Sequence, residues 1–208
     1  MKKIIKYIII GICILLIGTI YLFSSANTHQ DALTEAQVNS LCDYFASNAS
    51  PDKELKTEGT SQAAVKIFGT REKNEFTQVY GYVSSGYYVK HKDKAYDISG
   101  FNALFMVDLI KDNDSVKVVK EYGDGISTQS TLKAMPFRYR LKSKHYNPHD
   151  ANGYCKVQKD ADKKAEQVLG VPVEKSGSIS FSGNKYIIFD IDKNGNIIDL
   201  EEGKLEDF

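Results

Sequence analysis

The sequence has 208 residues with 27 Lys or Arg and 27 Asp or Glu, so its formal net charge at pH 7 is zero. This balance argues against a nucleic-acid partner, because nucleic-acid-binding domains carry a clear excess of basic residues. The 13 Tyr and 10 Phe, with no Trp, favour a domain rich in β-sheet.

The first predicted element is a membrane segment. Lys2, Lys3 and Lys6 precede an apolar run over residues 7–23 that contains no charged residue. The run is near the lower limit of length for crossing a bilayer, and the lysines keep its start in the cytoplasm. We therefore expect residues 1–27 to be a signal anchor, with a single pass through the cell membrane and the rest of the chain outside the cytoplasm. Small residues before Ala26 also suit a signal peptidase, so secretion after cleavage near Ala26 is the alternative.

Residues 28–60 are expected to form a polar stalk followed by an amphipathic helix. Thr34 and Gln37 form a capping box at its start, in which each side chain bonds the other residue's backbone N–H. Pro51 is expected to stop the helix. Apolar residues recur at helical spacing and predict one buried face: Val38, Leu41, Cys42, Phe45 and Ala49.

From Ala63 onward the pattern is that of strands rich in Val, Ile, Phe and Tyr. Short polar connections between them favour an antiparallel meander, with the helix packed across its inner face. The four predicted strands cover Ala63–Gly69, Phe76–Lys90, Gly100–Lys111 and Val116–Tyr122.

The C-terminal part is expected to contain short helices and a hairpin. A short helix or helical turn is predicted over Ser127–Ala134, and a better helix over Asp160–Leu169, which Gly170 ends. Asn194-Gly195 joins Lys185–Asp192 to Asn196–Glu201 and is typical of a tight hairpin turn. We predict an α+β fold with residues 61–208 as the sheet domain and residues 28–208 as one folded unit. A helix on a curved antiparallel sheet is the arrangement of cystatin- and NTF2-like folds.

Three runs carry a resemblance to a known domain: FGTREKNEFTQVYGYV, SGFNALFMVDLIKDNDSVKVVKEYGDG and TLKAMPFRYRLKSK. They are similar to the C-terminal extracytoplasmic region attached to clostridial antirepressor metallopeptidases of the beta-lactam-sensor type. The resemblance covers roughly residues 60–170 and rests on turns and strand faces, such as Gly69-Thr70 and Met135-Pro136. The chain has no His-Glu-x-x-His motif. The resemblance thus implies a fold and a location in a Gram-positive-type bacterium, but no catalytic site.

The segment Asp190–Glu201 fits a 12-residue calcium loop, with glycine at the sixth position. Calcium takes six to eight oxygen ligands, and this spacing would supply them from carboxylates, amides and a backbone carbonyl. The same letters also describe an ordinary hairpin with acidic edges, since Lys185–Phe189 is strand-like. The candidate calcium ligands are Asp190, Asp192, Asn194, Asn196 and Glu201.

Cysteine and histidine residues offer two further interpretations. A disulfide between Cys42 and Cys155 would close a long loop, whereas a buried free thiol is equally natural for Cys42 on the apolar helix face. His145, His149, Asp150 and Cys155 are of the types that bind zinc, but a polar surface loop explains them as well.

The sequence favours a non-enzymatic binding or sensing domain for an unknown ligand or protein partner of the cell envelope. A cluster of tyrosines is the candidate groove lining, although tyrosines on a half-buried sheet more often pack beside a helix: Tyr80, Tyr82, Tyr87 and Tyr88. A calcium-binding surface module and an envelope hydrolase are the alternatives. The hydrolase would use a thiol or a Ser-x-x-Lys element such as Ser130–Lys133. Lys175-Ser176-Gly177 imitates the third motif of penicillin-recognising enzymes, but their middle Ser-Asp-Asn element is absent.

Overall fold

A computed structural model describes residues 33–49, 59–123, 128–151, 153–175, 177–192, 194 and 196–205. The anchor expected over residues 1–27 lies outside these residues. In the part of the chain that is described, no helix has the length and apolar character needed to cross a membrane.

The predicted amphipathic helix is confirmed as α2, Glu35–Ser47. Its capping box forms as expected: the Gln37 backbone N–H donates to Thr34 Oγ1 at 3.2 Å, and the Thr34 N–H donates to Gln37 Oε1 at 3.0 Å. The helix ends at Ser47 with Asn48 as its C-cap, before the proline that was expected to stop it. Leu41 and Phe45 lie on the buried face.

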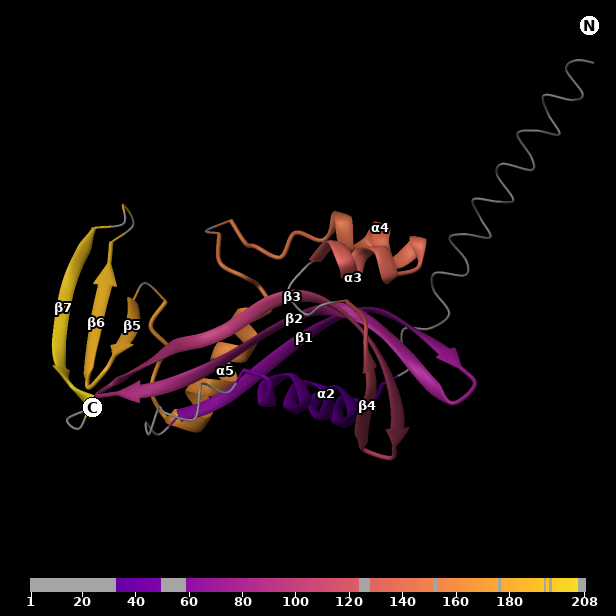
Figure 1. Cartoon of the computed structure of the whole chain (residues 1–208), viewed down its shortest axis with the longest axis horizontal. Coiled ribbons are helices and arrows are strands. Elements are labelled where there is room, and N and C mark those ends of the chain that lie inside the picture. The colour runs from indigo at the N-terminus through magenta and orange to yellow at the C-terminus, as the bar shows by residue number, and fades with distance from the viewer. Residues whose placement is uncertain are drawn as a thin grey trace, which may run out of the picture.

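The predicted meander is confirmed as a four-stranded antiparallel sheet in the order β1-β2-β3-β4. Bulges interrupt the register near Gly69, Tyr88 and Leu109, and such bulges bend a strand and increase its twist. The sheet accordingly curls into a half-barrel (Figure 1). β1 and β3 both start several residues before their predicted first residues, Ala63 and Gly100, whereas β2 and β4 start at or next to theirs. The strands are β1 Gly59–Lys73, β2 Phe76–His91, β3 Lys94–Asp112 and β4 Ser115–Glu121.

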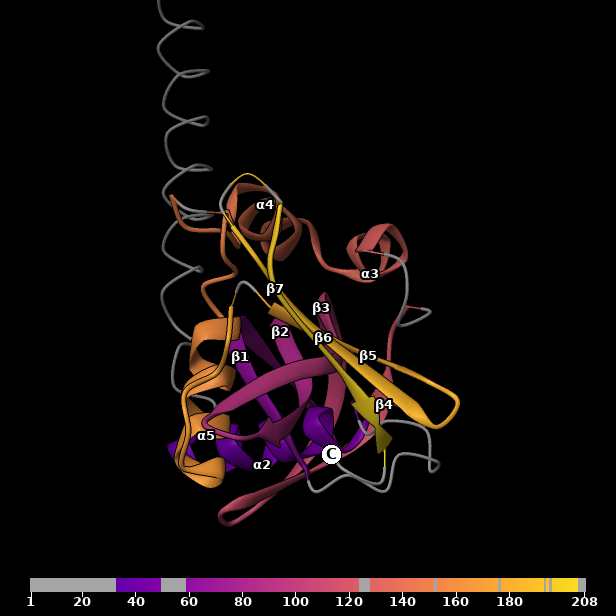
Figure 2. The same ribbon diagram turned by 90° about the vertical axis from the view of Figure 1, so that its left-hand side faces the viewer.

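The two faces of this sheet are covered by different helices, as the views in Figures 1 and 2 show. One face packs against α2 through a core that includes Leu41, Phe45, Val83 and Phe105. The other face carries α3 (Thr128–Ala134) and α4 (Phe137–His145), and α5 (Gln158–Leu169) lies along β1. Gly170 ends α5 in the left-handed conformation with φ of 70°, as predicted from its C-terminal glycine.

Helix α4 was not predicted, and its packing explains why it forms. Tyr139 stacks on Tyr80 of β2 with 4.2 Å between ring centroids, and its hydroxyl donates to the Thr70 carbonyl at 2.7 Å. A side chain at Gly69 would collide with the Tyr139 ring. Tertiary contact with the sheet therefore stabilises a segment whose own apolar pattern is weak.

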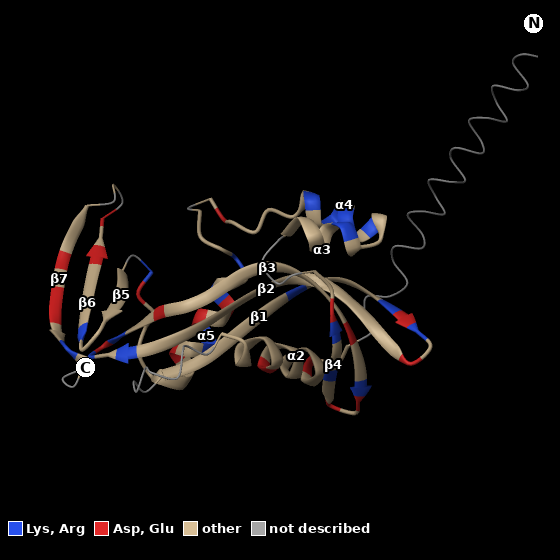
Figure 3. Ribbon diagram, in the orientation of Figure 1, with Lys and Arg blue, Asp and Glu red and all other residues tan. Residues whose placement is uncertain are grey.

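A second antiparallel sheet holds the C-terminal strands β5 (Gly177–Ser182), β6 (Lys185–Ile191) and β7 (Ile197–Lys204) in sequential order. The predicted hairpin is confirmed as β6–β7, whereas β5 was not predicted. Chain segment 172–174 joins this sheet to β3: the Ala95 N–H donates to the Pro172 carbonyl at 2.8 Å and the Glu174 N–H to the Ala95 carbonyl at 2.7 Å. Figure 3 shows basic residues gathered on α4 and acidic residues on β7.

Candidate binding site

The tyrosine cluster does not line an open groove. Tyr80 and Tyr88 have no exposed surface, and their side chains lie under α4 and α5 respectively. Tyr82 packs partly buried near Cys155, and Tyr87 lies on the opposite face against the second sheet. The expectation of a helix packing beside these rings is therefore met, but the hydroxyls of Tyr80 and Tyr88 are satisfied internally.

Tyr80 belongs to a buried polar network on the face under α3 and α4. Its hydroxyl donates to Gln78 Oε1, and Gln78 Nε2 donates to Asp108 Oδ1 at 2.6 Å. The Tyr122 hydroxyl donates to Asp108 Oδ2 at 2.6 Å. Burial raises the pKa of Tyr80, which keeps its hydroxyl protonated as a donor. The network fixes the end of β4 against β3.

A second network surrounds Asp162 of α5, which is 2% exposed. Its two oxygens accept from the Tyr88 hydroxyl at 2.9 Å and the Tyr154 hydroxyl at 2.5 Å. Burial and the charge of Asp162 raise the pKa of the neighbouring Asp97 to about 6. Asp162 is enclosed by its two tyrosines, whereas Asp97 is only half-buried and its Oδ2 accepts from Gln158 Nε2 at 3.4 Å.

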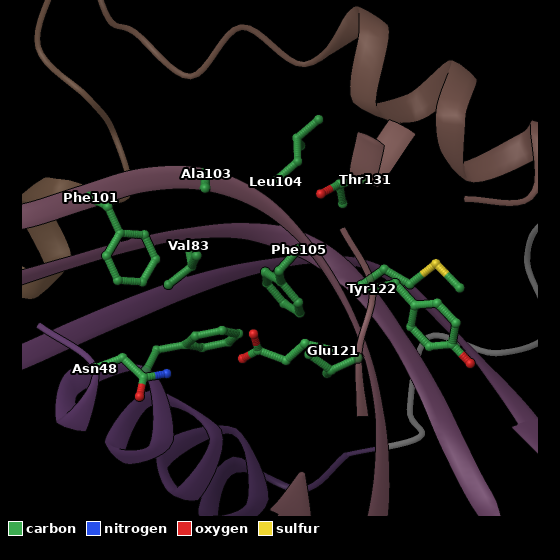
Figure 4. Close-up of a pocket in the computed structure, with 12 residues that line it drawn as sticks. Asn48, Val83, Phe101, Ala103, Leu104, Phe105, Glu121, Tyr122 and Thr131 are labelled. Carbon is green, nitrogen blue, oxygen red and sulfur yellow. The ribbon is translucent and has the colours of Figure 1, made fainter. Parts of the chain in front are cut away.

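The described residues form a pocket of about 200 Å³ at the outer edge of β3. Its lining residues come from both faces of that strand, because Phe101, Ala103 and Phe105 pack on the α2 side while Leu104 and Met106 pack on the α3 side. A pocket reached from both faces must lie at the strand's edge. Figure 4 shows Phe101, Val83 and Phe105 pointing toward α2, and Leu104 on the other side beside Thr131.

The pocket lies at the end of a row of cross-strand neighbours to which β1, β2 and β3 each contribute a residue but β4 does not. Val65 of β1 pairs with Val83 of β2, and Val83 pairs with Ala103 of β3. The fourth strand does not extend this row, because β4 pairs with β3 only from Val107 onward. Ala103 is small and leaves space between the end of the row and Phe45 of α2, which lines the same pocket.

The pocket lining is mainly apolar, with four polar side chains. The polar lining side chains are Asn48, Glu121, Tyr122 and Thr131, and the pocket's remaining lining residues are apolar. Nucleophilic catalysis needs an activated nucleophile beside a base. The Tyr122 hydroxyl donates to Asp108, and Thr131 of α3 lies on the other side of β3 from Glu121 (Figure 4). Glu121 is the one charged lining residue, and its Oε1 accepts from the Tyr44 hydroxyl at 2.8 Å.

The five candidate calcium ligands lie along the β6–β7 hairpin, but basic side chains occupy the key carboxylates. Asp190 Oδ2 is 2.8 Å from Lys94 Nζ, and Glu201 Oε2 is 2.6 Å from Lys92 Nζ. The Lys92 hydrogen bond lowers the pKa of Glu201 to about 2. Asp192 accepts from the backbone N–H groups of Asn194 and Asn196. In the described residues, no group of three or more His, Cys, Asp and Glu side chains is arranged to hold a metal ion.

The lysine contacts of Asp190 and Glu201 predict that calcium does not stabilise the protein. Calcium would have to displace two lysines from Asp190 and Glu201, so millimolar Ca²⁺ added after chelator treatment is expected to leave the thermal midpoint unchanged within about 1 °C. A ligand at a hundred times its Kd stabilises by about 2.7 kcal/mol, which is several degrees. A rise of that size with Ca²⁺ and not Mg²⁺, lost in Asp190→Asn, would contradict the expectation.

The two cysteines lie in different parts of the fold. Cys42 and Cys155 are both buried free thiols and belong to different cores, one around α2 and one beside α5. Of the candidate zinc ligands, His149 pairs with Cys155 in an isolated antiparallel bridge, while Asp150 pairs with Lys159 at 2.5 Å. Among the described residues these side chains form no group of three that could hold a metal ion. Ser130 and Lys133 lie on α3.

The residues that form the edge pocket were missed by sequence reasoning. Phe101 and Phe105 alternate along β3 in the pattern of a normal core-facing strand. One signal was present: the predicted third strand, Gly100–Lys111, is longer than the fourth, Val116–Tyr122. A longer strand beside a shorter one leaves part of its edge unpaired.

Comparisons with known proteins give no match to this chain, whether with models of protein families, with curated proteins or with solved structures. The resemblance to the antirepressor-associated domain therefore stays a prediction.

Proposed function

We propose that this chain is a membrane-anchored, extracytoplasmic binding or sensing domain that takes an apolar group of a cell-envelope ligand into the β3 edge pocket. The basic cluster and apolar run over residues 1–23 support the anchor and the location outside the cytoplasm. The resemblance to an exported domain of sensor-type membrane proteins supports the same location.

The proposal is carried by the pocket, which is lined by aromatic rings and lies where β4 adds no residue to the row of Val65, Val83 and Ala103. Phe45 and Phe105 form its inner wall with ring centroids 5.0 Å apart. At about 200 Å³ it is smaller than pockets that enclose whole drug-sized ligands. It suits a single apolar group, with the rest of the ligand lying on the surface.

A non-enzymatic role is supported by the mainly apolar lining, in which the Thr131 hydroxyl and the Glu121 carboxylate lie on opposite sides of β3. We also propose that α2 and the curved sheet form a cystatin- or NTF2-like fold. Its support is that α2 packs across one face of a curved antiparallel sheet.

The test fills the pocket from within. Ala103→Phe places a ring in the vacant end of the row, so saturable binding of the full chain in detergent to solubilised envelope fractions is expected to fall at least tenfold. The control is Val168→Phe, which adds the same ring at a residue of α5 that is 62% exposed and is expected to bind like the wild type. The proposal fails if the wild type shows no saturable binding, or if Ala103→Phe binds as well as the control.

A further inference from the structure

Among the described residues, the backbone at the mouth of the pocket forms a strand edge without a pairing partner. β3 is paired at both ends of its outer side: segment 172–174 bonds Ala95, and the Tyr122 N–H donates to the Met106 carbonyl at 2.9 Å. Between these two contacts, no described residue pairs with the outer edge over Gly100–Leu104.

The direction of the free backbone groups follows from strand geometry. The register between β2 and β3 runs without a break from Val107 back to Ser99, and backbone groups alternate sides along a strand. Since Met106 turns its carbonyl to β4, Leu104, Asn102 and Gly100 turn their N–H and C=O groups to the same open side. Unsatisfied edge groups of this kind are a template for another strand.

We propose that the occupant of the pocket is a side chain of an extended peptide segment from a partner protein, which adds to β3 as a further strand opposite Gly100–Leu104. This inference rests on the proposed function and names its ligand class. The added strand continues the line of β4, which already occupies the same side of β3 from Val107 onward. Its main chain would satisfy the free groups of Asn102 and Leu104, as in other cases of strand addition.

The row of Val65, Val83 and Ala103 determines which kind of peptide side chain fits the pocket. A residue placed opposite Ala103 becomes the fourth member of the row of Val65 and Val83, and its side chain points toward Phe45. An apolar residue therefore fits this position. Glu121 lies on the same face, because it pairs with Val107, and it favours a basic residue on the side of the peptide nearest β4.

The described residues around the end of β4 leave room for this strand. Gly123 has a φ of 105°, and a Cβ atom at this position would lie 2.5 Å from Thr131 Oγ1 of α3. At Gly123 the backbone therefore lies close against α3. Ser99, Gly100 and Asn102 are exposed, so a peptide can approach the edge from solvent.

The test uses a matched pair of substitutions at Asn102. Proline lacks the N–H and is tolerated at strand edges where that group faces outward, so Asn102→Pro removes one rung while leaving the β2–β3 pairing in place. Asn102→Ala keeps the N–H. Both variants lose the same side-chain bond, from Asn102 Nδ2 to Gln158 Oε1 at 3.4 Å.

The probe is a synthetic 12-residue peptide, chosen by selecting a displayed random library on the full chain in detergent, with a scrambled peptide as the control. We expect the selected peptides to alternate along a strand with one apolar anchor and a basic residue. Binding is expected to weaken about tenfold or more in Asn102→Pro and less than about threefold in Asn102→Ala. Saturating peptide should slow hydrogen exchange at the amides of Asn102 and Leu104 in the wild-type chain.

Three outcomes would overturn strand addition: no peptide is enriched, both Asn102 variants bind alike, or the two amides are already protected in the free chain. Protection in the free chain would mean that the chain itself or a second copy covers the edge, and sedimentation at two concentrations separates these cases. If Ala103→Phe loses envelope binding while Asn102→Pro retains it, the proposed function stands and strand addition fails. If neither variant changes envelope binding, both proposals fail.

Discussion

Asp97→Asn is expected to stabilise the protein by about 2 kcal/mol at pH 7 and to leave its stability at pH 4 nearly unchanged. Asp97 lies in β3 facing Asp162 of α5, and its Oδ1 is buried without a hydrogen-bond partner among the described residues. Burial, and then the charge of Asp162, raise its pKa from 3.8 to about 6. A shift of one pKa unit corresponds to about 1.36 kcal/mol. Because Asp97 is partly exposed, we expect a stabilisation of about 2 kcal/mol, less than the free energy that the whole shift would give.

The sign of the pH dependence follows from proton binding. Between about pH 4 and pH 6 the folded protein holds a proton at Asp97 that the unfolded chain has released, so stability falls as pH rises through this window. Above pH 6 the carboxylate is ionised in both the folded and the unfolded state. The loss of stability caused by burying its charge has then reached its full size. Asparagine carries no charge and removes that cost, so the difference between variant and wild type should grow from pH 4 to pH 7.

Urea unfolding followed by circular dichroism at pH 4, 5, 6 and 7 measures this difference. The control is Asp112→Asn, an exposed aspartate of the same strand, which should change the free energy of unfolding by less than about 0.5 kcal/mol at each pH. A constant difference across the range, or a less stable Asp97→Asn variant at pH 7, would show that Asp97 is not buried as a charge.

Leu41→Ala is expected to lower the free energy of unfolding by about 3 kcal/mol. Leu41 has no exposed surface and lies in the core between α2 and the sheet, with Phe45, Val83 and Phe105. Truncating a buried leucine removes its transfer free energy and leaves a cavity, which together cost 2 to 5 kcal/mol in typical cores (about 3 in the middle of that range).

The matched control for this substitution is Val38→Ala, because Val38 lies on the same helix and is only partly buried against the same core. It should cost about 1 kcal/mol or less in the same urea titration. Equal losses at the two positions would mean that α2 does not dock through Leu41. A loss below 1 kcal/mol for Leu41→Ala would contradict the packing of α2 described above.

Much of the fold could be predicted because its signals are local. The capping box of Thr34 and Gln37 sets the start of α2, and Gly170 sets the end of α5. The four strands were found from their alternating β-branched and aromatic residues, and short polar turns predicted their antiparallel order. In each case the deciding hydrogen bonds or side-chain periods lie within a few residues of one another.

Elements with weak local patterns were missed for the converse reason. α4 forms because Tyr139 stacks on Tyr80 and bonds the backbone of Thr70, far away in the sequence. β5 is short and rich in Ser and Gly, and it gains its place by pairing with β6. Neither contact can be predicted from the sequence of the segment that it stabilises, because its partner lies elsewhere in the chain.

The sequence by itself determined the α+β class, the order of the strands and the character of the buried helix face, because these depend on local hydrogen bonding and on the period of apolar residues. Only the tertiary structure decided the site. It buried Tyr80 and Tyr88, placed Lys94 and Lys92 on the carboxylates of Asp190 and Glu201, and left Ala103 at the end of an incomplete row. Such features depend on which distant side chains meet across the sheet, and this is set by the curvature and the register of the strands together.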